Sequence, residues 1–225
     1  MKKFNILLLA FILTSTIAIS QTYYYGIKGG LGLNMQKWNT FQRELLFTPL
    51  IDLMVESYDE MPSRLYAQLG FHTRGSAVRG FGFTAFNAYR FNNIALEIGG
   101  KRMITNDKKY NGYYMLGLRA EYNISTNLNS TNTNSLYNLV SDEFVNKFIY
   151  GASVGGGFEY EFSENKIIFV ELSFNPDLAI QYEQLESYTY TDINGIKHSI
   201  RPQEVRNFSL ELKVGYKFMQ GYIDD

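Results

Sequence analysis

The sequence predicts an all-β fold, an antiparallel up-and-down transmembrane β-barrel of eight to ten strands. Three observations predict it: apolar and polar residues alternate through most of the chain, aromatic residues are frequent, and the connections differ greatly in length. Aromatic residues make up 16% of the 225 residues, with 19 Gly and only 4 Pro. This composition favours strands, in which aromatic side chains pack well and proline interrupts the hydrogen-bonded ladder. The length suits a single domain.

The first twenty residues form a separate segment. Lys2 and Lys3 supply a positive start, residues 6–18 are mostly apolar, and Ala18-Ile19-Ser20 has the small residues that precede cleavage. The apolar run is shorter than the roughly 18 to 20 residues of a spanning helix. We therefore expect residues 1–20 to be a cleaved signal peptide and residues 21–225 to be the outer-membrane β-barrel domain.

The alternating pattern recurs in nine segments of the mature chain. An example is 207–218, "NFSLELKVGYKF", in which every even position is apolar or aromatic. Most of the segments approach the nine to eleven residues that a tilted strand needs to cross a bilayer. In chain order, the segments are 23–35, 51–56, 65–72, 81–91, 94–101, 113–124, 148–162, 168–175 and 207–218.

The two faces of these segments differ in a way that favours a membrane barrel. One face is aliphatic at mid-strand with Tyr and Phe towards the ends, which is typical of a surface that meets lipid. The other face carries Gly, Ser, Asn and charges of both signs, as an enclosed interior does. A secreted β-sandwich or lipocalin-like barrel is the alternative, because it too alternates polar and apolar residues.

The connections leave the strand number open. "FNN" at 91–93 and "SEN" at 163–165 read as tight turns, whereas 125–147 and 181–205 are long and polar. Counting forward from the first segment makes "FNN" periplasmic and "TNDKKYN" at 105–111 extracellular. Counting back from the last segment makes both long connections extracellular and "SEN" periplasmic, so the two counts disagree by one crossing between 92 and 147. A bacterial barrel of one chain has an even number of strands. Either a tenth strand lies within 134–148, or one of the nine segments is not a strand. "INGI" at 193–196 predicts a two-residue hairpin turn.

Charged residues at the polar positions predict a charge network inside the barrel. An eight-stranded barrel is just wide enough to be filled by side chains, so these charges are expected to pair and close it, whereas ten strands would leave room for a narrow channel. The predicted network comprises Lys28, Asp52, Glu56, Glu97, Lys101, Arg119, Glu121, Glu159, Glu171, Glu211 and Lys213. Arg90 and Lys217 are expected to face inward with them.

Several function classes lack the residues that they need. The formal net charge is −1 and no basic stripe is present, which argues against a nucleic-acid partner. The chain has no Cys, so thiolate metal sites and Cys nucleophiles are excluded. The glycine clusters lack the Lys-Ser/Thr of a phosphate loop. His72 and His198 have no nucleophile placed beside them by the sequence. We therefore predict no catalytic, cofactor-binding or metal-binding residues.

Three stretches together resemble a known family. They are "YGIKGGLGLN" at 25–34, "LYAQLGFHTRG" at 65–75, and the final Leu210-x-Leu212-x-Val214-Gly215-Tyr216-x-Phe218. The chain resembles the PorT-like small outer-membrane β-barrels of Bacteroidota, a porin-like, OmpA/OmpX-like group. The resemblance implies an eight-stranded barrel in the outer membrane of a Gram-negative cell envelope, and segment 113–124 looks additional to that pattern.

The last segment also resembles the C-terminal signal that the barrel assembly machinery recognises. Tyr216 and Phe218 occupy the positions of its terminal aromatic residues. The expected partners are therefore outer-membrane lipid and, during biogenesis, the assembly machinery. The expected function is that of a structural or interaction subunit with a side-chain-filled lumen, accessory to a larger outer-membrane export, uptake or assembly complex. A narrow solute pore and a lipid-modifying enzyme are the alternatives.

Overall fold

A computed structural model gives the fold and describes residues 22–37, 44–58, 62–79, 86–104, 109–128, 142–184, 188–191, 195–200 and 202–220. The predicted signal peptide at 1–20 lies outside the described residues, so its cleavage stays a prediction. No helix in the described part of the chain has the length and apolar character needed to cross a membrane.

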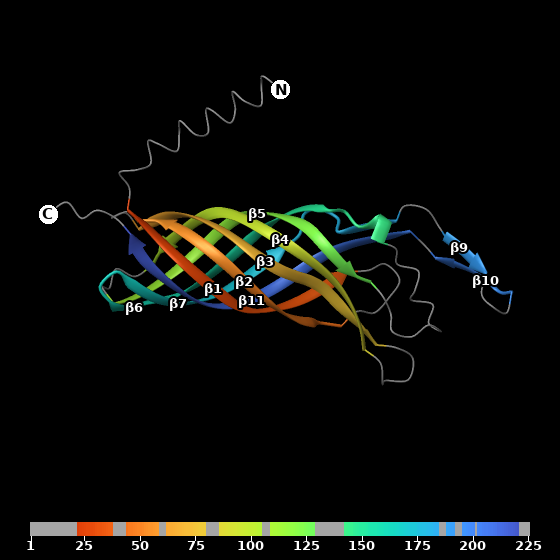
Figure 1. Cartoon of the computed structure of the whole chain (residues 1–225), viewed down its shortest axis with the longest axis horizontal. Helices are drawn as coiled ribbons and strands as arrows, with labels where there is room; N and C mark the ends of the chain where they lie inside the picture. The colour runs from red at the N-terminus through yellow and green to blue at the C-terminus, as the bar shows by residue number, and fades with distance from the viewer. Residues whose placement is uncertain are drawn as a thin grey trace, which may run out of the picture.

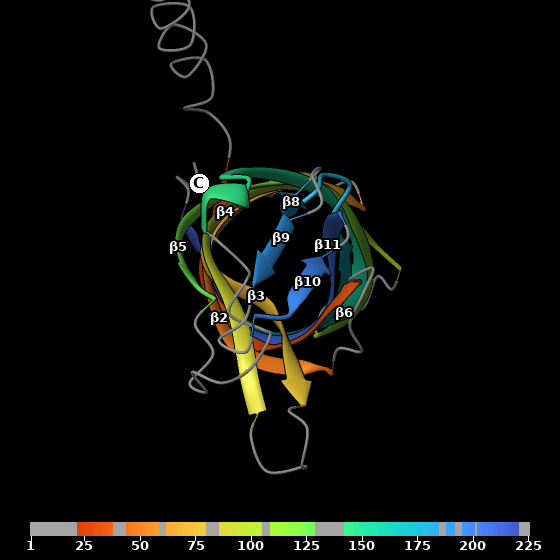
Figure 2. The same cartoon turned by 90° about the vertical axis from the view of Figure 1, so that its right-hand side faces the viewer.

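Eight antiparallel strands form a closed barrel (Figures 1 and 2). Each strand from β1 to β7 pairs with the next, β7 pairs with β11, and β11 pairs back with β1. Closure pairs every one of these strands on both sides, as lipid surroundings require. The predicted up-and-down barrel is confirmed. Its strands are β1 (Tyr23–Lys37), β2 (Leu46–Ser57), β3 (Ser63–Arg79), β4 (Phe86–Met103), β5 (Tyr110–Asn127), β6 (Phe148–Ser163), β7 (Lys166–Pro176) and β11 (Gln203–Gln220).

The two ends of the barrel differ in their connections (Figure 1). At the end where Tyr23 pairs with Gln220, here called the terminal end, β6 and β7 are joined by a tight turn in which Asn165 adopts a φ of 63°. Asparagine tolerates this left-handed conformation better than most residues do. At the opposite, loop end, the connections 128–147 and 177–202 are long. β4 ends and β5 begins at the terminal end, so the forward count that put 105–111 on the extracellular side is wrong, although 105–108 lie outside the described residues.

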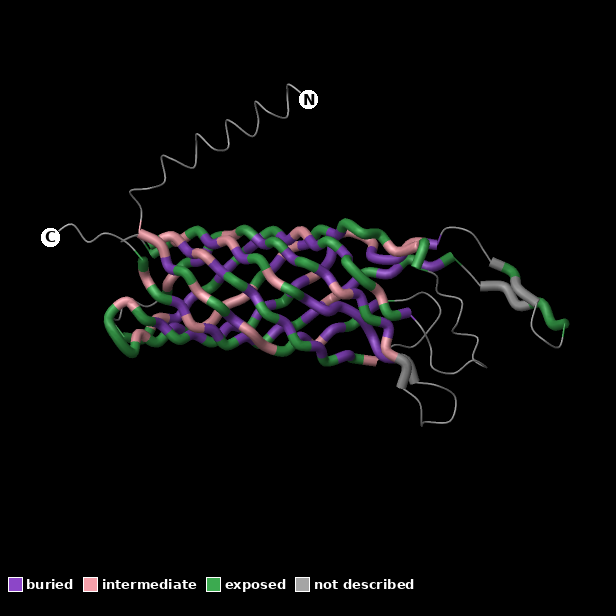
Figure 3. Tube along the Cα trace, in the orientation of Figure 1, coloured by how far each residue is buried: buried purple, intermediate pink, exposed green. Residues whose placement is uncertain are grey.

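Alternating burial divides each strand between two faces (Figure 3). In β2 the pattern of buried and exposed residues changes strictly with every residue from Leu46 to Met54. The exposed positions are apolar: Leu118 is 73% and Phe158 is 76% exposed. A water-soluble protein rarely exposes so continuous an apolar surface, whereas a barrel in lipid needs one.

Segments 81–91 and 94–101 belong to one strand, which explains why the sequence suggested nine segments. "FNN" at 91–93 is not a turn but part of β4, in which inward and outward residues alternate without a break from Tyr89 to Ile98. Tyr89 and Phe91 are therefore buried inside, at 1% and 0% exposure, while Arg90 is exposed, so the expectation that Arg90 faces inward is wrong. The β4–β5 register shifts opposite Asn92 and Asn93, where Ile124 is the extra residue on β5. Positions 81–85 lie outside the described residues.

The loop end carries short elements beyond the wall. Within 134–148 the described residues form the 3-10 turn η2 (Asp142–Phe144) and a single bridge from Val145 to Tyr182. Because the wall closes with eight strands, the ten-stranded alternative is wrong, and 113–124 belongs to the ordinary wall strand β5.

Two further pairings complete this end of the molecule. The short β8 (Tyr182–Gln184) extends the sheet beside β11. β9 (Tyr188–Thr191) and β10 (Lys197–Ile200) form a hairpin that projects beyond the barrel (Figure 1). The predicted two-residue turn at 193–196 lies partly outside the described residues, and Gly195 within it adopts a φ of 78°.

Candidate functional site

The barrel interior holds the densest group of charged side chains in the described structure. All the residues of the predicted network lie there, and none is more than 3% exposed. They come from every wall strand except β3, because successive inward positions on the strands point to the same narrow axis. We call this group, together with the charged residues that join it below, the interior network. It forms three clusters along the barrel.

The first cluster lies near the terminal end and is a ring of alternating charges. Lys101 Nζ is 2.8 Å from Glu56 Oε2 and 2.7 Å from Glu159 Oε1. Lys217 Nζ repeats this arrangement, at 2.8 Å from Glu56 and 2.7 Å from Glu159. Arg64 on β3 adds a contact of 3.0 Å to Glu56. Each carboxylate therefore meets two ammonium groups, and strands β2, β3, β4, β6 and β11 are tied together across the lumen.

Aromatic side chains surround the lysines of the same cluster. Lys101 Nζ lies 3.9 Å from the centre of the Tyr113 ring, and Lys217 Nζ lies 4.7 Å from that of Tyr24. A cation above a ring face is attracted by the ring's quadrupole. The rings thus take up the space between the lysines and the wall while keeping a favourable surface towards the charges.

The middle cluster centres on Lys28, Lys213 and their carboxylates. Lys28 Nζ contacts Glu171 Oε1 at 2.5 Å, and Lys213 lies 3.6 Å from Asp52 and 3.8 Å from Glu171. His72 Nε2 is 2.6 Å from Asp52 Oδ1. Asp52 approaches the chain of β3 so closely that a side chain on the facing Gly70 would collide with it.

Glu97 adds a different kind of contact to the middle cluster. Tyr66 donates to it from 2.6 Å and Ser153 from 2.8 Å. These hydroxyl groups satisfy a buried carboxylate that would otherwise incur a desolvation cost. The network is therefore held by neutral donors as well as by ion pairs.

The third cluster lies towards the loop end and is built on two arginines. Arg74 pairs with Glu211 and, at 2.8 Å, with Glu121. Arg119 lies 2.8 Å from Glu121 and pairs with Asp177. Their planar guanidinium groups can meet two carboxylates at once, which suits them to bridging strands.

Sequence reasoning missed two members of this cluster. Arg74 continues the inward even positions of 66, 68, 70 and 72, so extending that alternation by one step would have found it. Asp177 follows the last residue of β7 and continues the inward odd positions 171, 173 and 175, so the same one-step extension would have found it. Asn207 holds the Asp177 carboxylate from 2.8 Å.

The charges of the described interior nearly balance. Seven cations, Lys28, Arg64, Arg74, Lys101, Arg119, Lys213 and Lys217, face eight carboxylates, Asp52, Glu56, Glu97, Glu121, Glu159, Glu171, Asp177 and Glu211. Buried ions persist only when they are paired and hydrogen-bonded, since desolvation alone costs several kcal/mol per ion. Mutual pairing therefore joins side chains of different strands across the lumen in each of the three clusters.

His72 and His198 belong to different parts of the molecule. His72 is buried, and its Nδ1 lies 3.1 Å from Arg74 Nη2, while Asp52 occupies its other nitrogen. The backbone of His198 belongs to β10 in the projecting hairpin. Ser76 donates to Gln36 from 2.9 Å. Asp52 and Arg74 thus hold His72 within the interior network.

The predicted assembly residues lie on the outer face of β11. The ring centres of Tyr216 and Phe218 are 6.3 Å apart, and Tyr216 lies equally far from Phe162. They form part of an aromatic group near the terminal end. Recognition of these residues by the assembly machinery stays a prediction.

Comparisons with known proteins identify the fold. No family model matches the chain, and no curated protein matches its sequence. The chain is similar in structure to the outer membrane protein OprG from Pseudomonas aeruginosa, with a TM-score of 0.58, 8% identity, and coverage of 90% of this chain and 98% of that one. It is also similar to a major outer membrane protein from Thermus thermophilus, with a TM-score of 0.52, 12% identity, and coverage of 88% and 99%. The chain therefore has the fold of the small outer-membrane β-barrels.

Proposed function

We propose that the protein is a small outer-membrane β-barrel that acts as a structural or interaction subunit and does not conduct solutes. The observation that carries the proposal is the interior network, whose three clusters fill the lumen with paired charges. A conducting barrel needs a continuous water-filled channel, whereas the interior of an eight-stranded barrel is filled by its own side chains. The function must then reside in the outer surface or in the loop end.

The distribution of outward charges supports the placement in a membrane. On the described wall strands, outward charges lie at the loop end, at Lys37, Arg90, Glu204 and Arg206, and at the terminal end, at Arg102 and Lys166. Apart from the polar group of Thr73, Asn92 and Ser125 near the loop end, the outward strand positions between them are apolar or aromatic or are glycine, alanine or proline. This is the depth profile that a hydrocarbon layer selects. With short turns facing the periplasm, the terminal end lies inside and the loop end outside.

Conductance in planar bilayers tests the sealed lumen. Purified protein inserted into a bilayer is expected to give no single-channel currents above the lipid background. A double variant, Lys101→Ala with Lys217→Ala, removes both ammonium groups that hold Glu56 and Glu159 at the terminal end. This variant is the comparison in which currents are expected. Stable currents from the unaltered protein would overturn the proposal and establish the narrow pore in its place.

The hairpin β9–β10 is the surface that we assign to a partner. It projects beyond the loop end of the wall (Figure 1). Its two strands pair only with each other in the described structure, so their outer edges remain available for strand addition by another chain. We propose that this hairpin attaches the barrel to a larger outer-membrane export, uptake or assembly complex.

Mild-detergent extraction of tagged protein, followed by native mass measurement, tests the attachment. We expect a complex of defined stoichiometry that is lost when residues 188–200 are replaced by a short Gly-Ser linker. Shortening the opposite, terminal-end connection 104–109 is the matched control, and it should leave the complex intact. A bare barrel mass from the unaltered protein would refute the attachment while leaving the sealed barrel standing.

The finer family placement belongs to the same proposal. The stretches at 25–34, 65–75 and 210–218 support a PorT-like barrel of Bacteroidota. All three lie on wall strands, and the first and last pair directly as β1 and β11. The proposal extends to fold and location only. The lipid-modifying enzyme gains no support from the buried, mutually bonded His72 and Asp52.

A further inference from the structure

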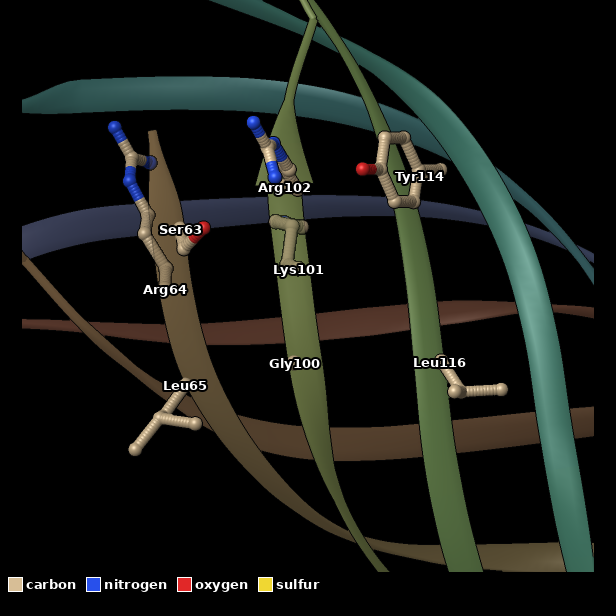
Figure 4. A pocket seen from close by; sticks show the side chains of 8 residues that line it. All are labelled: Ser63, Arg64, Leu65, Gly100, Lys101, Arg102, Tyr114 and Leu116. Atoms are coloured by element: carbon tan, nitrogen blue, oxygen red, sulfur yellow. The ribbon is translucent and has the colours of Figure 1, made fainter. Parts of the chain in front are cut away.

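The outer face of the barrel has a hollow at Gly100 on β4. The hollow has a volume of about 240 Å³ and is lined by residues of β3, β4 and β5. Gly100 pairs with Leu65 on one side and with Leu116 on the other, and both leucines are exposed. Figure 4 shows the two leucines standing on either side of a glycine that has no side chain to fill the space between them.

The next cross-strand row towards the terminal end is polar. Arg102 pairs with Ser63 on β3 and with Tyr114 on β5, so a guanidinium group stands between two hydroxyl-bearing residues (Figure 4). This row lies two positions from Gly100, which is about 7 Å along a strand. On the other side of Gly100, the row of Ala67, Ile98 and Leu118 is wholly apolar. The hollow thus has a cationic rim and an apolar floor.

Arg102 faces outward, unlike the cations of the interior network. Its neighbour Lys101 points inward and is engaged by Glu56 and Glu159. Within the described residues no carboxylate forms an ion pair with Arg102. An exposed arginine at the edge of an apolar belt reaches the level of the lipid headgroups, where anionic groups attract it.

We propose that this hollow binds one glycerophospholipid of the membrane leaflet at the terminal end. Its phosphate lies at Arg102, where the guanidinium can make paired hydrogen bonds to phosphate oxygens, and the hydroxyl groups of Ser63 and Tyr114 flank it. One acyl chain lies over Gly100 between Leu65 and Leu116. The inference rests on the membrane placement proposed above, which supplies the lipid.

The charge and shape of the hollow together specify this occupant. A free anion would satisfy Arg102 but would leave the apolar floor empty, and a hydrocarbon chain alone would leave the arginine without a counter-ion. A phospholipid presents both groups at the required separation and order, headgroup towards the terminal end and chain towards the membrane centre. Tyrosine at the boundary between these two regions is typical of interfacial positions.

A second hollow on the outer face provides a matched control. It lies at Gly29, has a volume of about 440 Å³, and is flanked by Ile51 and Val214. Its lining is apolar on the outer face, and the rows next to it carry no outward cation. A side chain added at Gly29 makes only ordinary contacts, and one added at Gly100 meets nothing within 4 Å. Both glycines can therefore be replaced by leucine without collision of the added Cβ.

Native mass spectrometry of protein reconstituted with phosphatidylglycerol and then extracted tests the proposal. We expect one retained lipid on the unaltered protein and on Gly29→Leu. Arg102→Gln should weaken retention about tenfold, the change that loss of one charge-assisted hydrogen bond produces. Gly100→Leu should also weaken retention, because the added side chain occupies the place of the acyl chain. Arg102→Lys should retain part of the lipid because it keeps the charge.

The possible outcomes separate this inference from the proposed function. Equal lipid retention by the unaltered protein, Arg102→Gln and Gly100→Leu overturns the inference, as does retention of detergent alone, provided that the protein inserts into bilayers. Failure of the unaltered protein to insert overturns the membrane placement and the inference with it. If Gly100→Leu does not fold, the comparison of Arg102→Gln with Arg102→Lys decides the matter alone.

Discussion

Replacing Lys101 by methionine should reveal how strongly the interior network holds the barrel together. Methionine keeps the approximate length of the side chain and removes its charge. In the structure Lys101 lies 2.8 Å from Glu56 and 2.7 Å from Glu159, and all three side chains are at most 2% exposed. The substitution leaves Lys217 as the nearest ammonium group for both carboxylates, so one negative charge loses its compensation.

The magnitude follows from the burial of the cluster. Removing one partner of a buried ion pair costs about 3–5 kcal/mol, because the remaining ion stays desolvated. Arg64 lies near both carboxylates, at 3.0 Å from Glu56 and 3.6 Å from Glu159, and its side chain is 13% exposed. Arg64 therefore compensates part of the negative charge that Lys101 leaves unpaired. The expected loss in the free energy of unfolding is near the lower figure, about 3 kcal/mol.

Urea titration of the barrel in lipid vesicles, followed by circular dichroism and by the mobility of unheated samples in gels, measures this loss. Lys166→Met removes an exposed lysine at the same end and should change stability by less than about 0.5 kcal/mol. The double variant Lys101→Met with Glu159→Gln restores the charge balance. It should be about 1–3 kcal/mol more stable than the sum of the single effects predicts.

Two results would refute the reasoning. A loss below about 1 kcal/mol for Lys101→Met, the value typical of exposed pairs, would mean that water screens the interior. Strict additivity of Lys101→Met and Glu159→Gln would mean that the two groups do not interact in the folded barrel, contrary to their 2.7 Å separation.

Three other predictions concern the outer face, the assembly signal and the tightness of the lumen. Leu212→Arg, at the middle of β11 with 53% exposure, should cost about 2–4 kcal/mol in vesicle unfolding, and a neutral result would disprove that this face meets lipid. Phe218→Ala should reduce the fraction of protein assembled in outer membranes, while Phe162→Ala, an aromatic change at the same end, should not. Equal reductions by the two variants would contradict the role of Phe218 in an assembly signal. Gly70→Val should destabilise the barrel by more than about 1 kcal/mol because the valine side chain collides with Asp52. An unchanged midpoint of urea unfolding would contradict the close approach of Asp52 to Gly70.

Alternation alone determined most of the fold. Side chains in a strand point to opposite faces with a period of two, so the local sequence states which residues share a face. This placed Glu56, Glu159, Glu171 and Lys213 together before any pairing was known. The alternating pattern did not predict which residues pair with one another. Lys217 meets Glu56 across 161 residues, and that contact exists only because closure of β1 on β11 brings distant strands to face one another across a narrow lumen.

The tertiary structure decided the features that depend on register. "FNN" at 91–93 looked like a turn in the sequence and gave one strand too many, whereas its pairing with both β3 and β5 makes it part of the single strand β4. The hollow at Gly100 likewise exists because Leu65 and Leu116 lie opposite it on two other strands. The sequence by itself determined the class of fold and the two faces, because period and composition are local. Strand number, ion partners and the outer hollow required the structure, because they arise from which residues of distant strands come to lie side by side.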